Sequence, residues 1–146
     1  GTGSGILAIA AAKLGAAEVA AFDTDNLAVR ATVDNAVQNS VADVIHAWRG
    51  ELDSVREEVG RRTWDVVVAN ILAPVIIQLL SEKGLLDYVA PGGRLVLSGI
   101  ILEQGAAVEA AISGAGGQVD GTITAGDWIT YIAGRRRGAQ PAVGVH

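Results

Sequence analysis

The 146-residue sequence contains no cysteine, and this absence excludes both disulfide bonds and metal sites built from thiolates. It also mildly favours a cytoplasmic location. Aromatic residues make up only 4% of the chain, so we expect a core of alanine, valine, leucine and isoleucine. No apolar run reaches the roughly 18 residues of a membrane span, because lysine, aspartate or glutamate interrupts each one. The composition therefore predicts one globular domain without a membrane partner.

Positive charge is also scarce, since the formal net charge is -5 at pH 7. An acidic surface repels phosphate backbones, which disfavours direct binding of nucleic acid. The exception is the run Arg135–Arg137, which we interpret as a solvated charged segment after the last strand, with a flexible tail over residues 138–146. An acidic crevice would attract cationic substrates instead, such as lysine side chains and protein amino termini.

Hydrophobic periodicity predicts alternating helices and strands. We expect helices over residues 6–15, 25–38, 71–89 and 102–113, and strands over residues 18–22, 43–48, 64–70 and 94–100, followed by a strand pair within 118–134. The strand WDVVVAN shows no polar alternation, as expected when both faces of a strand are covered, and PGG at residues 91–93 is typical of a turn. The order predicts an α/β fold with a Rossmann-like, doubly wound, mostly parallel sheet and a closing antiparallel strand pair.

The clearest candidate for a ligand-binding loop is GTGSG at residues 1–5, directly before the first predicted helix. The dinucleotide-binding fingerprint requires a glycine where this chain has Ile6, which disfavours NAD as the ligand. A P-loop is excluded because no Gly-Lys-Ser/Thr sequence follows. Gly1, Gly3 and Gly5 therefore indicate a tight turn that brings a polar ligand close to backbone amides at a helix N-terminus.

Two further candidates stand at the ends of predicted strands, where ligands bind in open α/β sheets. The carboxylate of Asp23 could accept hydrogen bonds from both hydroxyls of a ribose. Asp25 competes for that role but occupies an expected helix N-cap position, and a third possibility is that both aspartates only cap the helix. Asn70 ends the WDVVVAN strand and could accept a hydrogen bond from an amine. A role in the turn and in capping the helix that contains Pro74 is an equal alternative for Asn70.

Five segments carry a resemblance to a known family: GTGSGILAIAAAKLGA, AFDTDNLAV, DVVVANILA, APGGRLVLSGIL and DWITYIAGRR. Their order resembles that of class I adenosylmethionine-dependent methyltransferases. More narrowly, the chain from Gly1 to about Arg137 is similar to the family that methylates ribosomal protein L11 of the large subunit. Methyltransferases that act on amino groups of nucleobases or on glutamine would carry Asn-Pro-Pro followed by an aromatic residue where this chain has Asn70-Ile71-Leu72-Ala73.

The resemblance implies that S-adenosyl-L-methionine is the cofactor and that residues 1–137 form its binding domain. It implies cofactor contacts from Gly1, Gly3, Gly5, Asp23, Thr24 and Asn70, with Asn70 also beside the incoming amine. The implied reaction is N-methylation of lysine and/or α-amino groups of a ribosomal protein. A class I methyltransferase acting on RNA or a small molecule is one alternative, and a non-catalytic fragment is another.

Other residues have weaker signals. His46 and His146 are the only candidates for a base near neutral pH, but His46 falls within a predicted strand, where packing is expected, and His146 ends the tail. We therefore expect catalysis to depend on holding the amine in line with the methyl group. Trp48 could flank the adenine, whereas Trp64 and Trp128 are expected to pack in the core or at a sheet edge rather than form a cation cage.

The resemblance further implies that a substrate-recognition domain and the first strand of the sheet precede Gly1 in the family. That strand would pair between the strands ending at Asp23 and Asn70, so a sheet without it leaves two rows of backbone groups unpaired. This loss is large for a fold with about 5–15 kcal/mol of stability. We therefore expect residues 1–146 alone to bind adenosylmethionine poorly or not at all. Isothermal titration calorimetry tests this expectation, and micromolar binding would contradict it.

Overall fold

The computed structural model describes residues 1–60 and 62–138, so nearly all of the predicted tail, including His146, lies outside the described residues. The chain divides into two compact units, Gly1–Arg61 and Arg62–His146. The prediction of one cofactor-binding domain over residues 1–137 stays a prediction. Within the described ranges, the structure contains no helix with the length and apolar character needed to cross a membrane.

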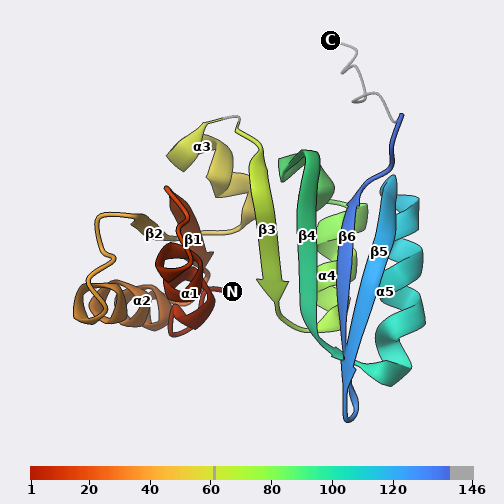
Figure 1. Ribbon diagram of the computed structural model, residues 1–146, viewed down its shortest axis with the longest axis horizontal. Helices are drawn as coiled ribbons and strands as arrows, with labels where there is room; N and C mark the ends of the chain where they lie inside the picture. The colour runs from red at the N-terminus through yellow and green to blue at the C-terminus, as the bar shows by residue number, and fades with distance from the viewer. Residues whose placement is uncertain (61, 139–146) are drawn as a thin grey trace. The chain divides into compact units, whose positions relative to one another are not determined.

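The first unit is built around two parallel strands that pair from Val19↔Ile45 to Asp23↔Arg49. Its elements are, in chain order, α1 (Ile6–Lys13), β1 (Val19–Asp23), α2 (Asn26–Gln38), β2 (Ile45–Arg49), the 3₁₀ turn η1 (Leu52–Ser54) and α3 (Val55–Val59) (Figure 1). Two helices and two strands are thus confirmed close to their predicted bounds. The polar segment RGELDSVREEVGRR at residues 49–62, in which helical periodicity is weak, contains η1 and α3.

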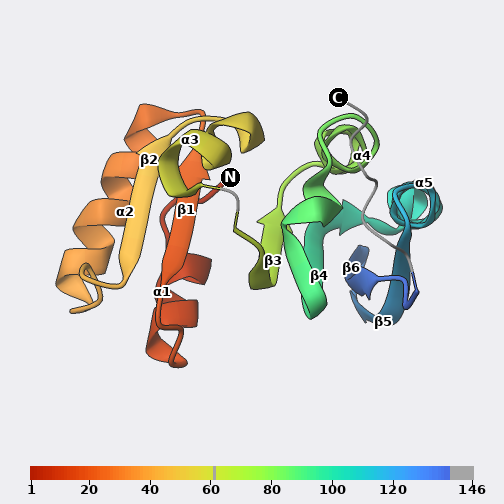
Figure 2. The same ribbon diagram turned by 90° about the horizontal axis from the view of Figure 1, so that it is seen from above.

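The second unit contains a four-stranded sheet in the order β3-β4-β6-β5. Its elements are β3 (Trp64–Asn70), α4 (Ala73–Ser81), the 3₁₀ turn η2 (Leu85–Tyr88), β4 (Val89–Ile101), α5 (Leu102–Gly114), β5 (Gly117–Ala125) and β6 (Trp128–Arg135). The pair β3–β4 is parallel, whereas β4–β6 and β6–β5 are antiparallel. Helices α4 and α5 lie side by side on one face of the sheet (Figures 1 and 2). The predicted α/β fold with a closing antiparallel pair is confirmed.

The core is mainly aliphatic, as the composition predicts. In the second unit it centres on β4, where the side chains of Leu95, Leu97 and Ile100 are fully buried. Ile76 of α4 and Ile112 of α5 are fully buried as well. Burial of apolar side chains between two helices and a sheet is the dominant stabilising term in such an arrangement.

Two predicted boundaries in this unit are wrong. The helix predicted over residues 71–89 ends at Ser81, because Gly84 takes a left-handed conformation with φ 68° and begins a 3₁₀ turn. The PGG turn is instead part of β4: pairing passes from Trp64↔Val89 to Val66↔Arg94, so the extra residues on β4 form a bulge. Gly92 supplies the positive φ of 77° within that bulge.

The expectation that β3 is covered on both faces does not hold within the second unit. Val66 and Val68 are 58% and 47% exposed, because α4 and α5 cover only one face of the sheet. Side chains alternate between faces along a strand, so Asn70 shares the exposed face with these two valines.

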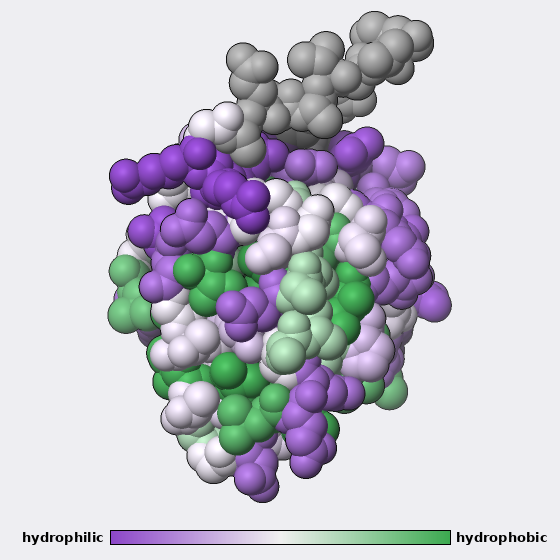
Figure 3. Space-filling model, turned by 90° about the vertical axis from the view of Figure 1, so that its right-hand side faces the viewer, coloured by the Kyte–Doolittle hydropathy of each residue, from purple (hydrophilic) through white to green (hydrophobic). Residues whose placement is uncertain are grey.

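Strand β5 forms an edge of this sheet. Figure 3 shows the side of the second unit that is formed by α5 and β5, and there polar residues interrupt the apolar surface. Ile123 of β5 is 58% exposed. An edge whose apolar surface is interrupted by polar groups is less prone to pair with a further strand than a continuous apolar edge.

Leu97→Ala tests the importance of the β4 core. Leu97 is 0% exposed, so truncation should lower the free energy of unfolding by about 2–5 kcal/mol through lost burial and the cavity left behind. The matched control Ile123→Ala removes an exposed side chain from β5 and should cost less than about 1 kcal/mol. Urea denaturation followed by circular dichroism measures both, and equal losses would contradict this assignment of the core.

Candidate functional site

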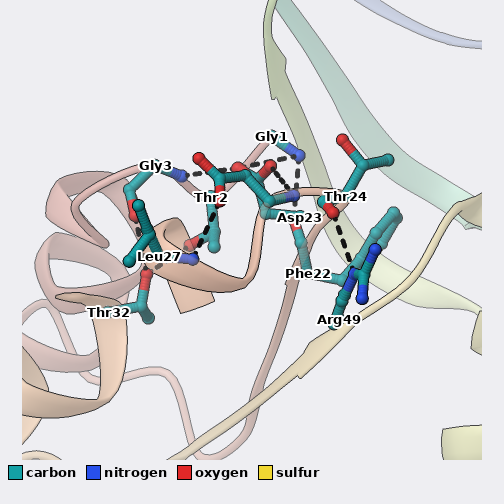
Figure 4. Close-up of polar contacts among 10 residues, drawn as sticks. Gly1, Thr2, Gly3, Phe22, Asp23, Thr24, Leu27, Thr32 and Arg49 are labelled. Carbon is teal, nitrogen blue, oxygen red and sulfur yellow. Dashed lines mark hydrogen bonds and ion pairs between the residues drawn. The ribbon is translucent and has the colours of Figure 1, made fainter. Parts of the chain in front are cut away.

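The glycine loop is joined to the end of β1 by a set of hydrogen bonds (Figure 4). The backbone N–H of Thr2 donates to the carbonyl of Phe22 over 2.9 Å. The N–H of Gly3 donates to Oδ2 of Asp23 over 3.0 Å, and the N–H of Asp25 donates to Oδ1 of the same carboxylate over 3.0 Å. Asp23 therefore connects the loop, its own strand and the start of α2.

The environment of Asp23 favours its ionised form. Partial burial raises the pKa of the carboxyl group, but the hydrogen bonds from the backbone N–H groups of Asp25, Gly3 and Thr24 act in the opposite direction, and the net pKa is lowered. The side chain keeps 15% of its surface exposed. A carboxylate has about four acceptor sites, so Asp23 retains capacity for further donors.

Asp25 has the separate role that its position predicts. Its Oδ1 accepts a hydrogen bond from the N–H of Leu27 over 2.9 Å, which makes Asp25 the N-cap of α2. The two aspartates therefore divide their roles. Asp25 caps the helix, whereas Asp23 holds the loop and orders the turn that leads to Asp25.

Two side chains of α2 are hydrogen bonded to the glycine loop. Thr32 is fully buried; its hydroxyl donates to the carbonyl of Gly3 over 3.1 Å and lies 3.2 Å from the hydroxyl of Thr2. Asn35 donates from its side chain to the carbonyl of Ser4 over 2.8 Å. Gly5 is buried against this helix with φ 85°, and an added Cβ would lie 3.0 Å from Thr32. The absence of a side chain at Gly5 therefore allows the loop to pack closely against α2.

Gly1 and Gly3 are exposed, in contrast to Gly5. A Cβ at Gly3 would meet no atom within 4 Å, so the outer side of the loop is open. Gly5 is also the N-cap of α1 and offers no side-chain acceptor, while the first-turn amides of a helix have no intrahelical acceptor. This arrangement suits a polar ligand at the loop.

A shallow pocket of about 380 Å³ lies beside the end of β1 and is lined by Thr24, Arg49, Gly50 and Glu51. The guanidinium Nε of Arg49 donates to the carbonyl of Thr24 over 3.1 Å, as Figure 4 shows. Thr24 is a predicted site residue, whereas the other three were not predicted. The strand-end rule could have indicated them, because Arg49 ends β2 as Asp23 ends β1, and Gly50 and Glu51 come directly after it.

The adenine-flanking role suggested for Trp48 is wrong. Trp48 is only 7% exposed, its ring stacks on Phe22 at 5.2 Å, and its indole N–H donates to Ser54 over 2.9 Å. It belongs to the core of the first unit, where its ring also stacks on His46 at 5.2 Å. His46 is packed on one side only: its ring stacks on Trp48, whereas its side chain is 52% exposed and its Nε2 lies 3.1 Å from a carboxylate oxygen of Glu58.

The other two tryptophans lie in the second unit. Trp128 is 55% exposed at the start of β6, so it is not a core residue. The guanidinium of Arg62 lies 5.1 Å from the ring centroid of Trp64. This is a single cation–π contact at the start of β3, where Trp64 is half-buried, and not a cage of several aromatic rings.

Asn70 ends β3 opposite Ser98 of β4 and is exposed. Helix α4 begins with Leu72 as N-cap and receives no side-chain cap, so the helix-capping alternative for Asn70 is excluded. Pro74 stands in the first turn of α4, where its missing N–H has no cost. The structure thus brings Gly1, Gly3, Gly5, Asp23 and Thr24 together in the first unit, and it places Asn70 in the second.

Known proteins are similar to this chain in sequence and in fold. The family described as Ribosomal protein L11 methyltransferase (PrmA) matches residues 1–136. Curated proteins named Ribosomal protein L11 methyltransferase are similar: that of Listeria welshimeri is 39% identical over 135 residues and that of Exiguobacterium sibiricum 40% over 136. Each match covers 92% of this chain and 41% of the relative, so the chain spans less than half the length of these relatives.

Solved structures show the same likeness. A ribosomal protein L11 methylase from Lactobacillus delbrueckii subsp. bulgaricus superposes with a TM-score of 0.83 at 35% identity, covering 94% of this chain and 68% of that one. An RNA methyltransferase from Salinibacter ruber in complex with S-adenosyl-L-homocysteine has a TM-score of 0.67 at 20% identity, covering 100% of this chain and 83% of that one. The second likeness shows the Rossmann-like methyltransferase fold alone.

The lowered pKa of Asp23 predicts a pH-dependent stability. A carboxyl group whose pKa is lower in the folded chain stabilises the fold above its unfolded pKa of about 3.9, and this contribution disappears as the pH falls through the folded pKa. Asp23→Asn should therefore lower the free energy of unfolding at neutral pH, and its difference from the wild type should shrink below about pH 4. Chemical denaturation between neutral and acid pH measures this difference. Asp34→Asn, at an exposed position of α2, is the control, and an undiminished effect of Asp23→Asn at acid pH would contradict the prediction.

Proposed function

Because this chain belongs to the ribosomal protein L11 methyltransferase family, we propose that it binds S-adenosyl-L-methionine and contributes the methyl-transfer site of a ribosomal protein N-methyltransferase. The proposed substrates are lysine and/or α-amino groups of a ribosomal protein of the large subunit, L11 in the named relatives, and the proposed location is the cytoplasm. The observation that carries the proposal is Asp23 at the end of β1, hydrogen bonded to an open glycine loop.

The residues of the first unit fit the ribose and methionine parts of this cofactor. Both oxygens of Asp23 are fixed by backbone N–H groups and keep acceptor capacity for two vicinal hydroxyls. The open outer side of Gly3 leaves room for a ligand to approach the loop backbone. The adjoining pocket at Thr24 and Glu51 is of the size typical of small-molecule sites, about 300–1,000 Å³.

Asn70 is the residue proposed to act on the amine. When bound, the sulfonium cofactor supplies an electrophilic methyl group. An attacking amine needs a free lone pair, so its proton must first leave to solvent. The carboxamide oxygen of Asn70 accepts a remaining N–H bond and so orients the lone pair. Such positioning can supply a large part of the acceleration, since effective molarities of oriented groups reach about 10⁵ M or more.

The net charge of -5 supports a cationic protein substrate over RNA. The likeness to an RNA methyltransferase, at 20% identity, does not favour RNA as the substrate. A substrate rich in lysine is attracted to an acidic protein, whereas a phosphate backbone is repelled.

The test is a methyl-transfer assay on the complete gene product that contains this chain, with labelled cofactor and purified L11, ribosomal RNA or cell metabolites as acceptors. We expect label in L11 as N-methylated amines. Asp23→Ala should raise the KM for the cofactor about 10-fold or more by removing charge-assisted hydrogen bonds, and Asn70→Ala should lower kcat about 100-fold. Asp34→Ala and Asn39→Ala are exposed controls on and after α2. Label confined to RNA or a small molecule would refute the proposed substrate.

A further inference from the structure

Strand β4 touches the end of β3 at Gly99. An added Cβ at Gly99 would lie 2.7 Å from the carbonyl oxygen of Ile71, 2.8 Å from the carboxamide oxygen of Asn70 and 3.1 Å from the backbone nitrogen of Ile71. Real Cβ atoms essentially never approach heavy atoms within 3.0 Å. The side chain of Asn70 therefore lies directly against the backbone of Gly99.

Gly99 has a left-handed backbone conformation at this contact. Gly99 has φ 78°, which favours glycine, and the pairing of β4 with β6 is irregular between Leu97 and Ile100. Strand β4 is also hydrogen bonded to the residue that follows β3: the N–H of Ile71 donates to the carbonyl of Ser98 over 3.3 Å. Glycines in the left-handed conformation at such irregularities commonly re-aim nearby groups beside active sites.

We propose that Gly99 is a positioning residue for methyl transfer: its bare backbone fixes where the Asn70 carboxamide lies. The proposal rests on the role proposed above for Asn70. Any side chain at residue 99 displaces either the carboxamide or the Ile71 peptide, and a displacement of about 1 Å can cost about 100-fold in rate. Gly99 touches neither substrate nor cofactor in this scheme, since it acts through Asn70.

The experiment compares Gly99→Ala with Gly92→Ala in the complete gene product. Both glycines lie on β4 with nearly the same φ, 78° and 77°, but a Cβ at Gly92 meets no atom within 4 Å. The φ angles of the two positions are therefore matched, whereas the contacts that an added Cβ would make differ. We expect Gly99→Ala to lower kcat by about 10–100-fold with the cofactor dissociation constant unchanged, and Gly92→Ala to retain the wild-type kcat.

A double-mutant cycle with Asn70→Ala separates positioning from a general structural role. If Gly99 acts through Asn70, Gly99→Ala should lower kcat little further once the carboxamide is gone. Gly99→Asn repeats the cycle with a residue that tolerates positive φ better, in case the alanine variant does not fold. Additive losses, or wild-type kcat in both Gly99 variants while Asn70→Ala is impaired, would overturn the positioning role alone. Wild-type kcat in Asn70→Ala would overturn both this inference and the role proposed for Asn70.

Discussion

The candidate site depends on one carboxylate. Asp23 accepts hydrogen bonds from the loop at Gly3 and from the turn at Asp25, so a single side chain joins the glycine loop, β1 and the start of α2. Thr32 and Asn35 hold the same loop from the side of α2. Because these bonds exist within the protein itself, the loop is organised before any ligand arrives, and little conformational entropy remains to be lost on binding.

Much of the fold could be predicted from the sequence because local signals agreed with the packing. Apolar spacing located α2, an N-cap located its start at Asp25, and the uninterrupted valines located β3. The predictions failed where the deciding contact is distant in the sequence. PGG is typical of a turn, but its pairing with β3 incorporates it into β4 as a bulge. No local signal distinguishes these two outcomes.

For the candidate site, too, local signals were sufficient for some residues, whereas contacts between distant parts of the sequence were missed. The rule that ligands lie at strand ends was sufficient to single out Asp23 and Asn70, since it needs only the order of strands. The predicted strand ended at Trp48, one residue before the end of β2 at Arg49, and the ring of Trp48 is buried by contacts with Phe22 of β1 and His46. Thr32 and Gly99 were not predicted. Thr32 cannot be told from other polar residues of a helix by its sequence. Gly99 is singled out only by its closeness to Asn70, which depends on the pairing of β4 with β3.

The buried position of Trp48 also makes the first unit spectroscopically simple. Trp48 is the only tryptophan among residues 1–61, whereas Trp64 and Trp128 belong to the second unit. Its indole is shielded from water and stacked on Phe22, directly before the pocket-lining residues Arg49 and Gly50. Residues 1–146 with the second-unit tryptophans replaced would therefore carry a single tryptophan, whose emission would report the order of β2 and the state of the neighbouring pocket without any attached label.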